Sequence, residues 1–84
     1  MNTIVDKSRI AGKIRAIIVE KLGVEAPKLK DTASFTDDLG LDSLDVLETF
    51  TTIEKEFDIK ISDEEAEKLT TVGSVIRFVM ERAR

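Results

Sequence analysis

The sequence predicts an all-α protein: a four-helix bundle with three long helices, one short helix and a long loop between the first and second helices. Apolar residues recur at helical spacing, capping residues precede the expected helices, and no segment alternates apolar and polar residues as a half-buried strand does. Residues 1–84 are expected to form a single domain with a thin core, because a chain of this length buries only about 60 to 65 per cent of its unfolded surface.

The first helix is predicted by apolar residues on one face, namely Ile10, Ile14, Ile17, Ile18 and Leu22. Thr3 can cap its start, and Gly23 stands where a residue with left-handed backbone would end it. Residues 24–41 contain the only proline and show no clear period, so they are expected to form a long ordered loop. Four apolar residues would hold this loop to the core: Val24, Leu29, Phe35 and Leu39.

The second helix, expected within residues 42–58, carries two apolar stripes. The first has the spacing of a core face and consists of Val46, Phe50, Ile53 and Phe57. Leu44 and Leu47 lie on a neighbouring strip with Thr51. Two interpretations of these leucines stay open: they widen the core stripe, or they form a small exposed apolar patch with an acidic rim, as a docking surface would.

The last two helices are predicted from their caps. Ser62 and Glu65 have the spacing of a capping box at the start of the short third helix. Thr70 or Thr71 can cap the fourth helix, whose buried side is expected to consist of Val72, Val75, Ile76, Val79 and Met80. Two basic residues near its end suit the negative end of the helix dipole: Arg82 and Arg84.

Charge is strongly segregated, although the net charge is only −4. Residues 35–68 contain twelve Asp and Glu against three Lys, a balance of −9, whereas the two flanks are positive. Such negative charge argues against nucleic acid and membrane surfaces as partners and favours a basic protein surface. The chain has no cysteine, and charges interrupt every apolar run near its start, so we expect a cytoplasmic protein without membrane insertion.

Ser43 lies in the most acidic stretch, DDLGLDSLD, but a catalytic role is not expected. The segment GLDSL superficially resembles the GDSL motif of serine hydrolases, yet Leu41 interrupts that motif, and the chain has no histidine to accept the hydroxyl proton. Lys55, which could serve as a base, lies about three turns along the helix. The protein is therefore not expected to be an enzyme.

A dedicated metal site is not expected either, although Asp37, Asp38, Asp42 and Asp45 are clustered. An EF-hand loop requires oxygen ligands at alternate positions, and the stretch DDLGLDSLDVLE has leucine at its third and fifth positions. A carboxylate cluster without that pattern predicts no calcium loop.

Two roles for Ser43 remain open on the residues alone. In the first, Asp42 or Ser43 caps the second helix, and the neighbouring acids each gain about 0.3 to 1 kcal/mol from the helix dipole. In the second, Asp42 is the cap and Ser43 is the first helical residue, with its hydroxyl pointing outward. A phosphodiester attached there would lie beside unpaired backbone N–H groups, and the serine would be a tether.

The residues Asp42, Ser43 and Leu44 resemble the prosthetic-group attachment motif of the acyl carrier proteins. The similarity covers nearly the whole chain, through KLGV, DTASFTDDLG and IEKEFDIKISDEEAEKLTTVGSVIRFV, and resembles the bacterial, dissociated fatty acid synthesis branch. It implies that a carrier-protein synthase, a phosphopantetheinyl transferase, moves 4′-phosphopantetheine from coenzyme A onto Ser43. A monomeric carrier would then shuttle growing acyl chains as thioesters between fatty acid synthesis enzymes.

The resemblance also implies two functional surfaces. Basic docking surfaces of partner enzymes would recognise residues of the second helix: Asp42, Leu44, Asp45, Leu47, Glu48, Thr51 and Glu54. The acyl chain would be sequestered in a pocket within the bundle, lined by Phe35, Val46, Phe50, Ile61, Ala66, Leu69 and Val72.

Three features depart from the family pattern. Phe50 is bulkier than the usual aliphatic residue, and Lys55 occupies a position that is usually acidic. A polar, β-branched run replaces the usual aliphatic residues and alanine: Thr49, Thr51 and Thr52. A specialised carrier for a polyketide, lipid A or aminoacyl pathway is therefore one alternative. A helical interaction module in which Ser43 only caps is the other.

Overall fold

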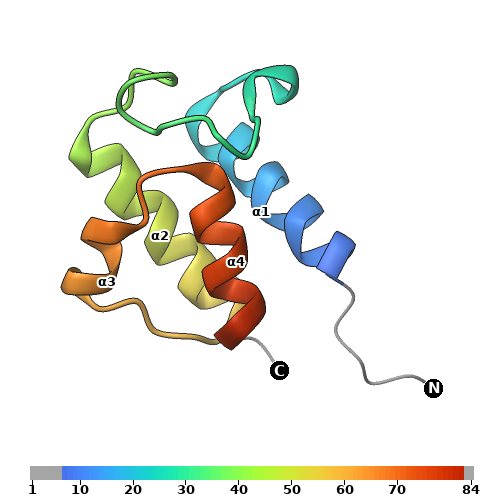
Figure 1. Cartoon of the computed structure of the whole chain (residues 1–84), viewed down its shortest axis with the longest axis vertical. Helices are drawn as coiled ribbons and strands as arrows, with labels where there is room; N and C mark the ends of the chain where they lie inside the picture. Colours follow the sequence, from blue (N-terminus) through green and yellow to red (C-terminus); the bar gives the residue numbers. More distant parts are fainter. Residues whose placement is uncertain (1–6, 83–84) are drawn as a thin grey trace.

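The computed structural model describes residues 7–82, which form four α-helices (Figure 1). They are α1 (Lys7–Leu22), α2 (Ser43–Phe57), α3 (Asp63–Lys68) and α4 (Val72–Arg82), with a 3₁₀ turn at Ala26–Lys28. No strand forms within this part of the chain. The predicted all-α fold, with three long helices and one short helix, is confirmed.

The predicted caps of α3 and α4 are present. At α3, the Glu65 backbone N–H donates to Ser62 Oγ at 3.1 Å, and the Ser62 N–H donates to the Glu65 carboxylate at 3.0 Å. At α4 the cap is Thr71 rather than Thr70, because the Ser74 N–H donates to Thr71 Oγ1 at 3.2 Å. Ser74 returns the bond by accepting from the Thr71 N–H at 3.1 Å.

The long helices α1 and α2 both end on a residue with left-handed backbone. Gly23 has φ of +67°, as expected from the sequence, and its N–H donates to the Val19 carbonyl at 2.9 Å. Asp58 has φ of +54° and caps α2 by donating to the Glu54 carbonyl. The cap expected at Thr3 and the dipole contact expected at Arg84 lie outside the described residues.

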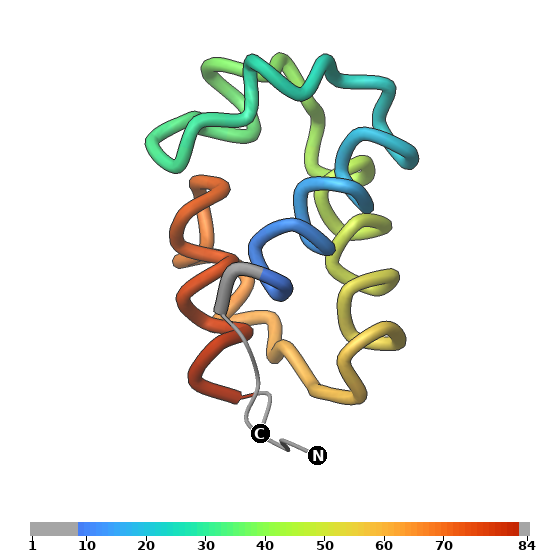
Figure 2. The backbone as a smooth tube through the Cα atoms, turned by 90° about the vertical axis from the view of Figure 1, so that its right-hand side faces the viewer, coloured from blue at the N-terminus to red at the C-terminus, as the bar shows by residue number. Residues whose placement is uncertain are grey.

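The core lies between the three long helices, because α1 packs against both α2 and α4 (Figure 2). It consists of Ile10, Ile14, Ile18, Phe50, Ile53, Val72, Val75, Ile76 and Val79, with Leu29, Ala33, Phe35 and Leu69 from the connections. Other residues of the predicted stripes are only partly buried at the edges of this cluster, namely Ile17, Leu22, Val46, Phe57 and Met80.

The loop between α1 and α2 crosses one end of the bundle and is bonded to the start of α4 (Figure 2). The Phe35 N–H donates to the Thr70 carbonyl, and the Val72 N–H donates to the Ala33 carbonyl, each at 3.0 Å. These bonds surround an isolated antiparallel bridge between Ser34 and Thr71. The loop is therefore ordered as expected, and the bridge fixes Phe35 in place.

Gly73 allows the loop to approach α4 closely. Its N–H donates to the Asp31 carbonyl at 2.8 Å, and a Cβ at Gly73 would lie 2.8 Å from that same backbone oxygen. We expect Gly73→Ala to lower the free energy of unfolding by about 1 to 3 kcal/mol, measured by urea denaturation, because the crowded atom belongs to the backbone.

The matched control is Gly12→Ala, on the exposed face of α1, where an added Cβ meets nothing within 4 Å. Alanine is the better helix former, so this variant should gain up to about 1 kcal/mol. Equal changes in the two variants would contradict the steric argument.

Candidate functional site

Asp42 organises the first turn of α2. Gly40, with φ of +65°, turns the chain toward the helix, and Asp42 follows with extended backbone. Asp42 Oδ1 accepts a hydrogen bond from the Asp45 backbone N–H at 2.9 Å. Of the two caps considered from the sequence, Asp42 is therefore the one that the structure contains, and Asp45 lies in the first turn as expected.

Ser43 is the first residue of α2, and its side chain is exposed. The cap does not use its hydroxyl, because Asp42 supplies the accepting oxygen. Backbone N–H groups in the first turn of a helix lack helical acceptors, and the positive end of the helix dipole lies there. The position thus fits a covalently attached phosphodiester, whose oxygens would lie beside free donors.

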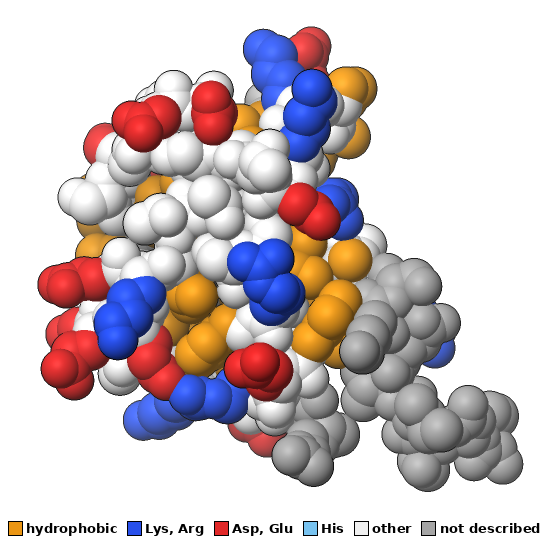
Figure 3. Space-filling model, in the orientation of Figure 1, with side chains coloured by type: hydrophobic (Ala, Val, Ile, Leu, Met, Phe, Trp, Pro, Cys, Tyr) orange, Lys and Arg blue, Asp and Glu red, His pale blue; other side chains and the backbone are white. Residues whose placement is uncertain are grey.

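Leu44 and Leu47 form an exposed apolar patch on α2. Leu44 is 64% exposed and Leu47 is 49% exposed, so of the two interpretations the structure shows the exposed one. Glu48 and Thr51 are exposed beside them. Figure 3 shows acidic side chains along the left side of the molecule, where Figure 1 places α3 and the start of α2. An apolar patch with an acidic rim suits a basic partner surface.

Glu54 has a structural contact that the sequence did not reveal. Its Oε2 accepts from the Ile61 backbone N–H at 2.7 Å, and its side chain is half-buried. The bond joins the last turns of α2 to the segment that leads into α3. No local pattern could indicate it, because the partner is a backbone group beyond a turn. The docking role of Glu54 stays a prediction.

The threonine run of α2 satisfies its own hydroxyl groups. Thr49 Oγ1 donates to the Asp45 carbonyl at 2.9 Å, and Thr49 is buried with 1% of its surface exposed. The hydroxyls of Thr51 and Thr52 donate in the same way to carbonyls four residues earlier, at 3.0 and 3.1 Å. Burying a hydroxyl group that has a hydrogen-bond partner costs little free energy. The core can therefore contain Thr49 in place of the usual aliphatic residue.

A groove of about 560 Å³ lies between α2, α3 and the loop that leads into α2. Its lining is mostly apolar, and Ser43 is part of it. The residues that line it are Phe35, Thr36, Ser43, Val46, Leu47, Phe50, Asp63, Ala66, Glu67, Leu69 and Thr70. The exposed hydroxyl of Ser43 and an apolar groove are thus adjacent.

Five of the seven expected pocket residues line this groove: Phe35, Val46, Phe50, Ala66 and Leu69. Val72 does not, because its fully buried side chain lies within the core between the helices. Ile61 packs against the core from outside the lining. Thr36 and Thr70 line the groove although no sequence pattern indicated them, since the bridge between the loop and α4 brings their segments together.

Helix α3 forms one wall of the groove. Its Ala66 packs against the core, and a polar contact joins the helix to α4. Arg82 of α4 pairs with Glu65, and its guanidinium lies 4.5 Å from the centroid of the Phe78 ring. The hydrogen bond from the Ser62 backbone N–H, together with Arg82, holds the pKa of Glu65 below its usual range. None of the six residues of α3 is buried.

Two of the four acidic residues near Ser43, Asp38 and Asp42, have side-chain contacts within the protein. Asp38 accepts from the Ser34 N–H at 2.7 Å, and Asp42 caps α2. Among residues 7–82, no group of three or more His, Cys, Asp or Glu side chains is placed to hold a metal ion. The same stretch contains no helix with the length and hydropathy of a membrane span.

Comparison with known proteins agrees with this geometry. A family model described as a phosphopantetheine attachment site matches residues 12–79. Among solved structures, the acyl carrier protein from Enterococcus faecalis is similar to this chain, with 34% sequence identity and a TM-score of 0.78. The match covers 92% of this chain and 98% of the Enterococcus chain.

The chain therefore belongs to the phosphopantetheine-attachment family, whose domains are carriers rather than catalysts. Within that family, the structural match places it with the acyl carrier proteins, as the sequence resemblance implied. Its cofactor is 4′-phosphopantetheine, bound covalently.

Proposed function

We propose that this protein carries growing acyl chains as thioesters on 4′-phosphopantetheine attached to Ser43, and that it shuttles them between fatty acid synthesis enzymes. One observation carries the proposal: the exposed hydroxyl of Ser43 lies at the start of α2 and on the lining of a groove of about 560 Å³. The arm supplies a thiol, which the cysteine-free chain lacks. The groove offers the attached chain an apolar surface.

The chain's own residues have three tasks in this function. Ser43 supplies the oxygen that displaces adenosine bisphosphate from coenzyme A, and the transferase accepts the hydroxyl proton. Asp42 and Leu44 flank this serine at the helix start, where Asp42 fixes the first turn. The patch on α2 presents the site to partners. We further propose that the protein is itself not an enzyme and that residues 1–84 form one carrier domain of a cytoplasmic monomer.

The attachment is tested on the purified chain with coenzyme A, magnesium and a broad-specificity phosphopantetheinyl transferase, followed by an intact-mass measurement. We expect a gain of one phosphopantetheinyl group. An unchanged mass would refute the proposed function, and it would favour the interaction module in which Ser43 has no covalent role.

The pathway is tested by offering the loaded protein to enzymes of different kinds. Thr51 and the basic Lys55, two departures from the family pattern, favour a specialised carrier, whereas the acidic rim is compatible with the fatty acid enzymes. Efficient acceptance by fatty acid synthesis enzymes supports the proposal. Acceptance only by polyketide, lipid A or aminoacyl enzymes would assign the protein to the alternative.

Reversing one charge of the acidic rim should slow partner encounters. Glu48 is exposed beside Leu44 and Leu47, so Glu48→Lys would repel a basic docking surface. We expect acyl loading by a fatty acid synthesis enzyme to slow by about tenfold at low ionic strength, with a smaller loss at high salt. The measurement is the initial rate of loading at several salt concentrations.

The control is Glu20→Lys, which makes the same charge change at an exposed position of α1. It should leave the rate within about twofold, since it lies on a different helix from the patch. A rate loss as large in this control would mean that net charge, and not the α2 surface, governs the encounter.

A further inference from the structure

The groove ends at Phe50 along α2. On this helix the lining consists of Ser43, Val46, Leu47 and Phe50. Ile53, the next residue of the same stripe, is fully buried and does not line the groove. Phe50 thus separates the groove from the core beneath it.

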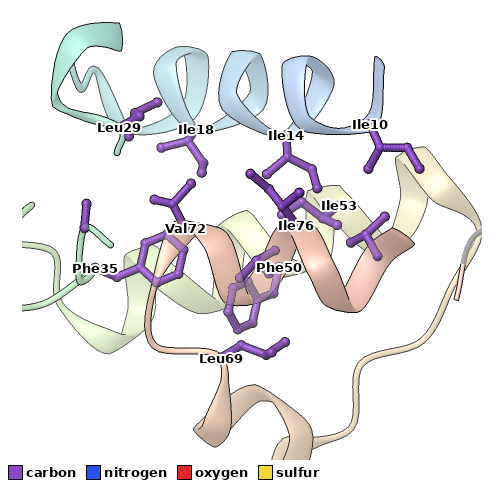
Figure 4. Packing of buried hydrophobic residues seen from close by; sticks show 13 residues of the cluster. Ile10, Ile14, Ile18, Leu29, Phe35, Phe50, Ile53, Leu69, Val72 and Ile76 are labelled. Carbon is purple, nitrogen blue, oxygen red and sulfur yellow. The ribbon is translucent and has the colours of Figure 1, made fainter. Parts of the chain in front are cut away.

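The ring of Phe50 is held in place by its neighbours. It is 3% exposed and meets the ring of Phe35 edge to face, with the centroids 6.0 Å apart and the planes at 79°. Phe35 is in turn fixed by its N–H bond to the Thr70 carbonyl and by accepting from the Leu41 N–H at 2.9 Å. Figure 4 shows the Phe50 ring next to Leu69, on the side of the core away from the isoleucines of α1, and the Phe35 ring next to Val72.

We propose that Phe50 sets the length of acyl chain that the groove holds, an inference that rests on the proposed function. Ser43 and Phe50 are seven residues apart, which is about 10.5 Å along the helix axis. The acyl chain begins at the thiol of the phosphopantetheine arm rather than at Ser43, so Phe50 sets how far along α2 the chain can extend. Each carbon–carbon bond advances an extended alkyl chain by about 1.25 Å.

Carbons that extend beyond Phe50 gain no further burial. A longer chain either displaces Phe50 from Phe35, which disrupts an aromatic pair, or leaves its end in water. Both outcomes stop the stabilisation that each buried methylene brings. If Phe50 is replaced by alanine, the end of the groove moves to Ile53, three residues and about 4.5 Å further along the helix. That distance takes about three to four more carbons.

The experiment uses the full chain loaded by the transferase with straight acyl groups of about four to fourteen carbons, and intact mass verifies each loading. The melting temperature is then plotted against chain length for each protein. For the wild type we expect a rise that ends in a plateau at the chain length that reaches Phe50. For Phe50→Ala the plateau should begin about three to four carbons later, and for the milder Phe50→Leu at least about one carbon later.

The matched control is Ile53→Val, which removes volume from a buried residue of α2 outside the groove. It should lower every melting temperature and leave the start of the plateau unchanged. A plateau at the same length in wild type and both Phe50 variants overturns the inference, as does the absence of any rise in a verified loaded protein. Failure of the proposed function is a separate result, because it appears earlier as an unchanged mass.

Discussion

Ser43→Ala is expected to abolish phosphopantetheine attachment and to leave the bundle as stable as before. The hydroxyl is the proposed nucleophile, and the structure shows a neighbouring residue, Asp42, as the cap of α2. Ser43 is exposed at the first helical position, where alanine is well tolerated, so the free energy of unfolding should stay within about 0.5 kcal/mol. Intact mass after the transferase reaction and urea denaturation measure the two properties.

Ser62→Ala is the matched control, and we expect it to lose stability while it keeps the phosphopantetheine attachment. Ser62 is also an exposed serine next to a helix start, but its oxygen accepts from the Glu65 N–H as the cap of α3. We expect this variant to lose about 0.5 to 2 kcal/mol and to keep the full mass gain. If Ser43→Ala instead behaved like Ser62→Ala, then Ser43 would be a structural residue and the attachment site would lie elsewhere.

Ile53→Ala is expected to give the largest loss of stability, about 2 to 5 kcal/mol. Ile53 is fully buried, and the residues around it come from three helices, so little of the lost volume can be refilled. Small domains have only about 5 to 15 kcal/mol of stability in total. The midpoint of urea denaturation should therefore fall sharply.

Leu44→Ala is the matched control, since it also shortens an aliphatic residue of α2. Leu44 is 64% exposed, so its free energy of unfolding should change by no more than about 0.5 kcal/mol. If the patch docks partners, the same variant should load acyl groups more slowly. A large stability loss at Leu44, or a small one at Ile53, would contradict the assignment of the two faces of α2.

Most of the fold could be predicted because its signals are local. The periodicity of α1, the left-handed Gly23 and the capping box of Ser62 and Glu65 each lie within a few residues of sequence. The start of α2 at Asp42 or Ser43 follows from such a signal too, and the structure shows that Asp42 is the cap. The 3₁₀ turn at Ala26–Lys28 is not predicted, because Pro27 indicates a break in regular structure without specifying which turn forms there.

The parts that the sequence could not predict depend on distant residues. The bridge between Ser34 and Thr71 joins the loop before α2 to the segment before α4. It thereby brings Thr36 and Thr70 to the groove. The exposure of Leu44 and Leu47 was also undecided, because their strip borders the core stripe and only the packing of the other helices shows where the core ends. The bond from Ile61 to Glu54 is undetectable for the same reason.

Helix α3 is expected to be less stable than the bundle of the three long helices. Its six residues are too few for an independent helix in water, and none of them is buried. Its attachments include the Arg82 pair with Glu65 and the bond between Ile61 and Glu54. Detaching α3 therefore costs a fraction of the free energy of global unfolding, and local opening of this segment leaves the three long helices packed. We therefore expect one wall of the groove to open more readily than the core that positions Ser43 unfolds.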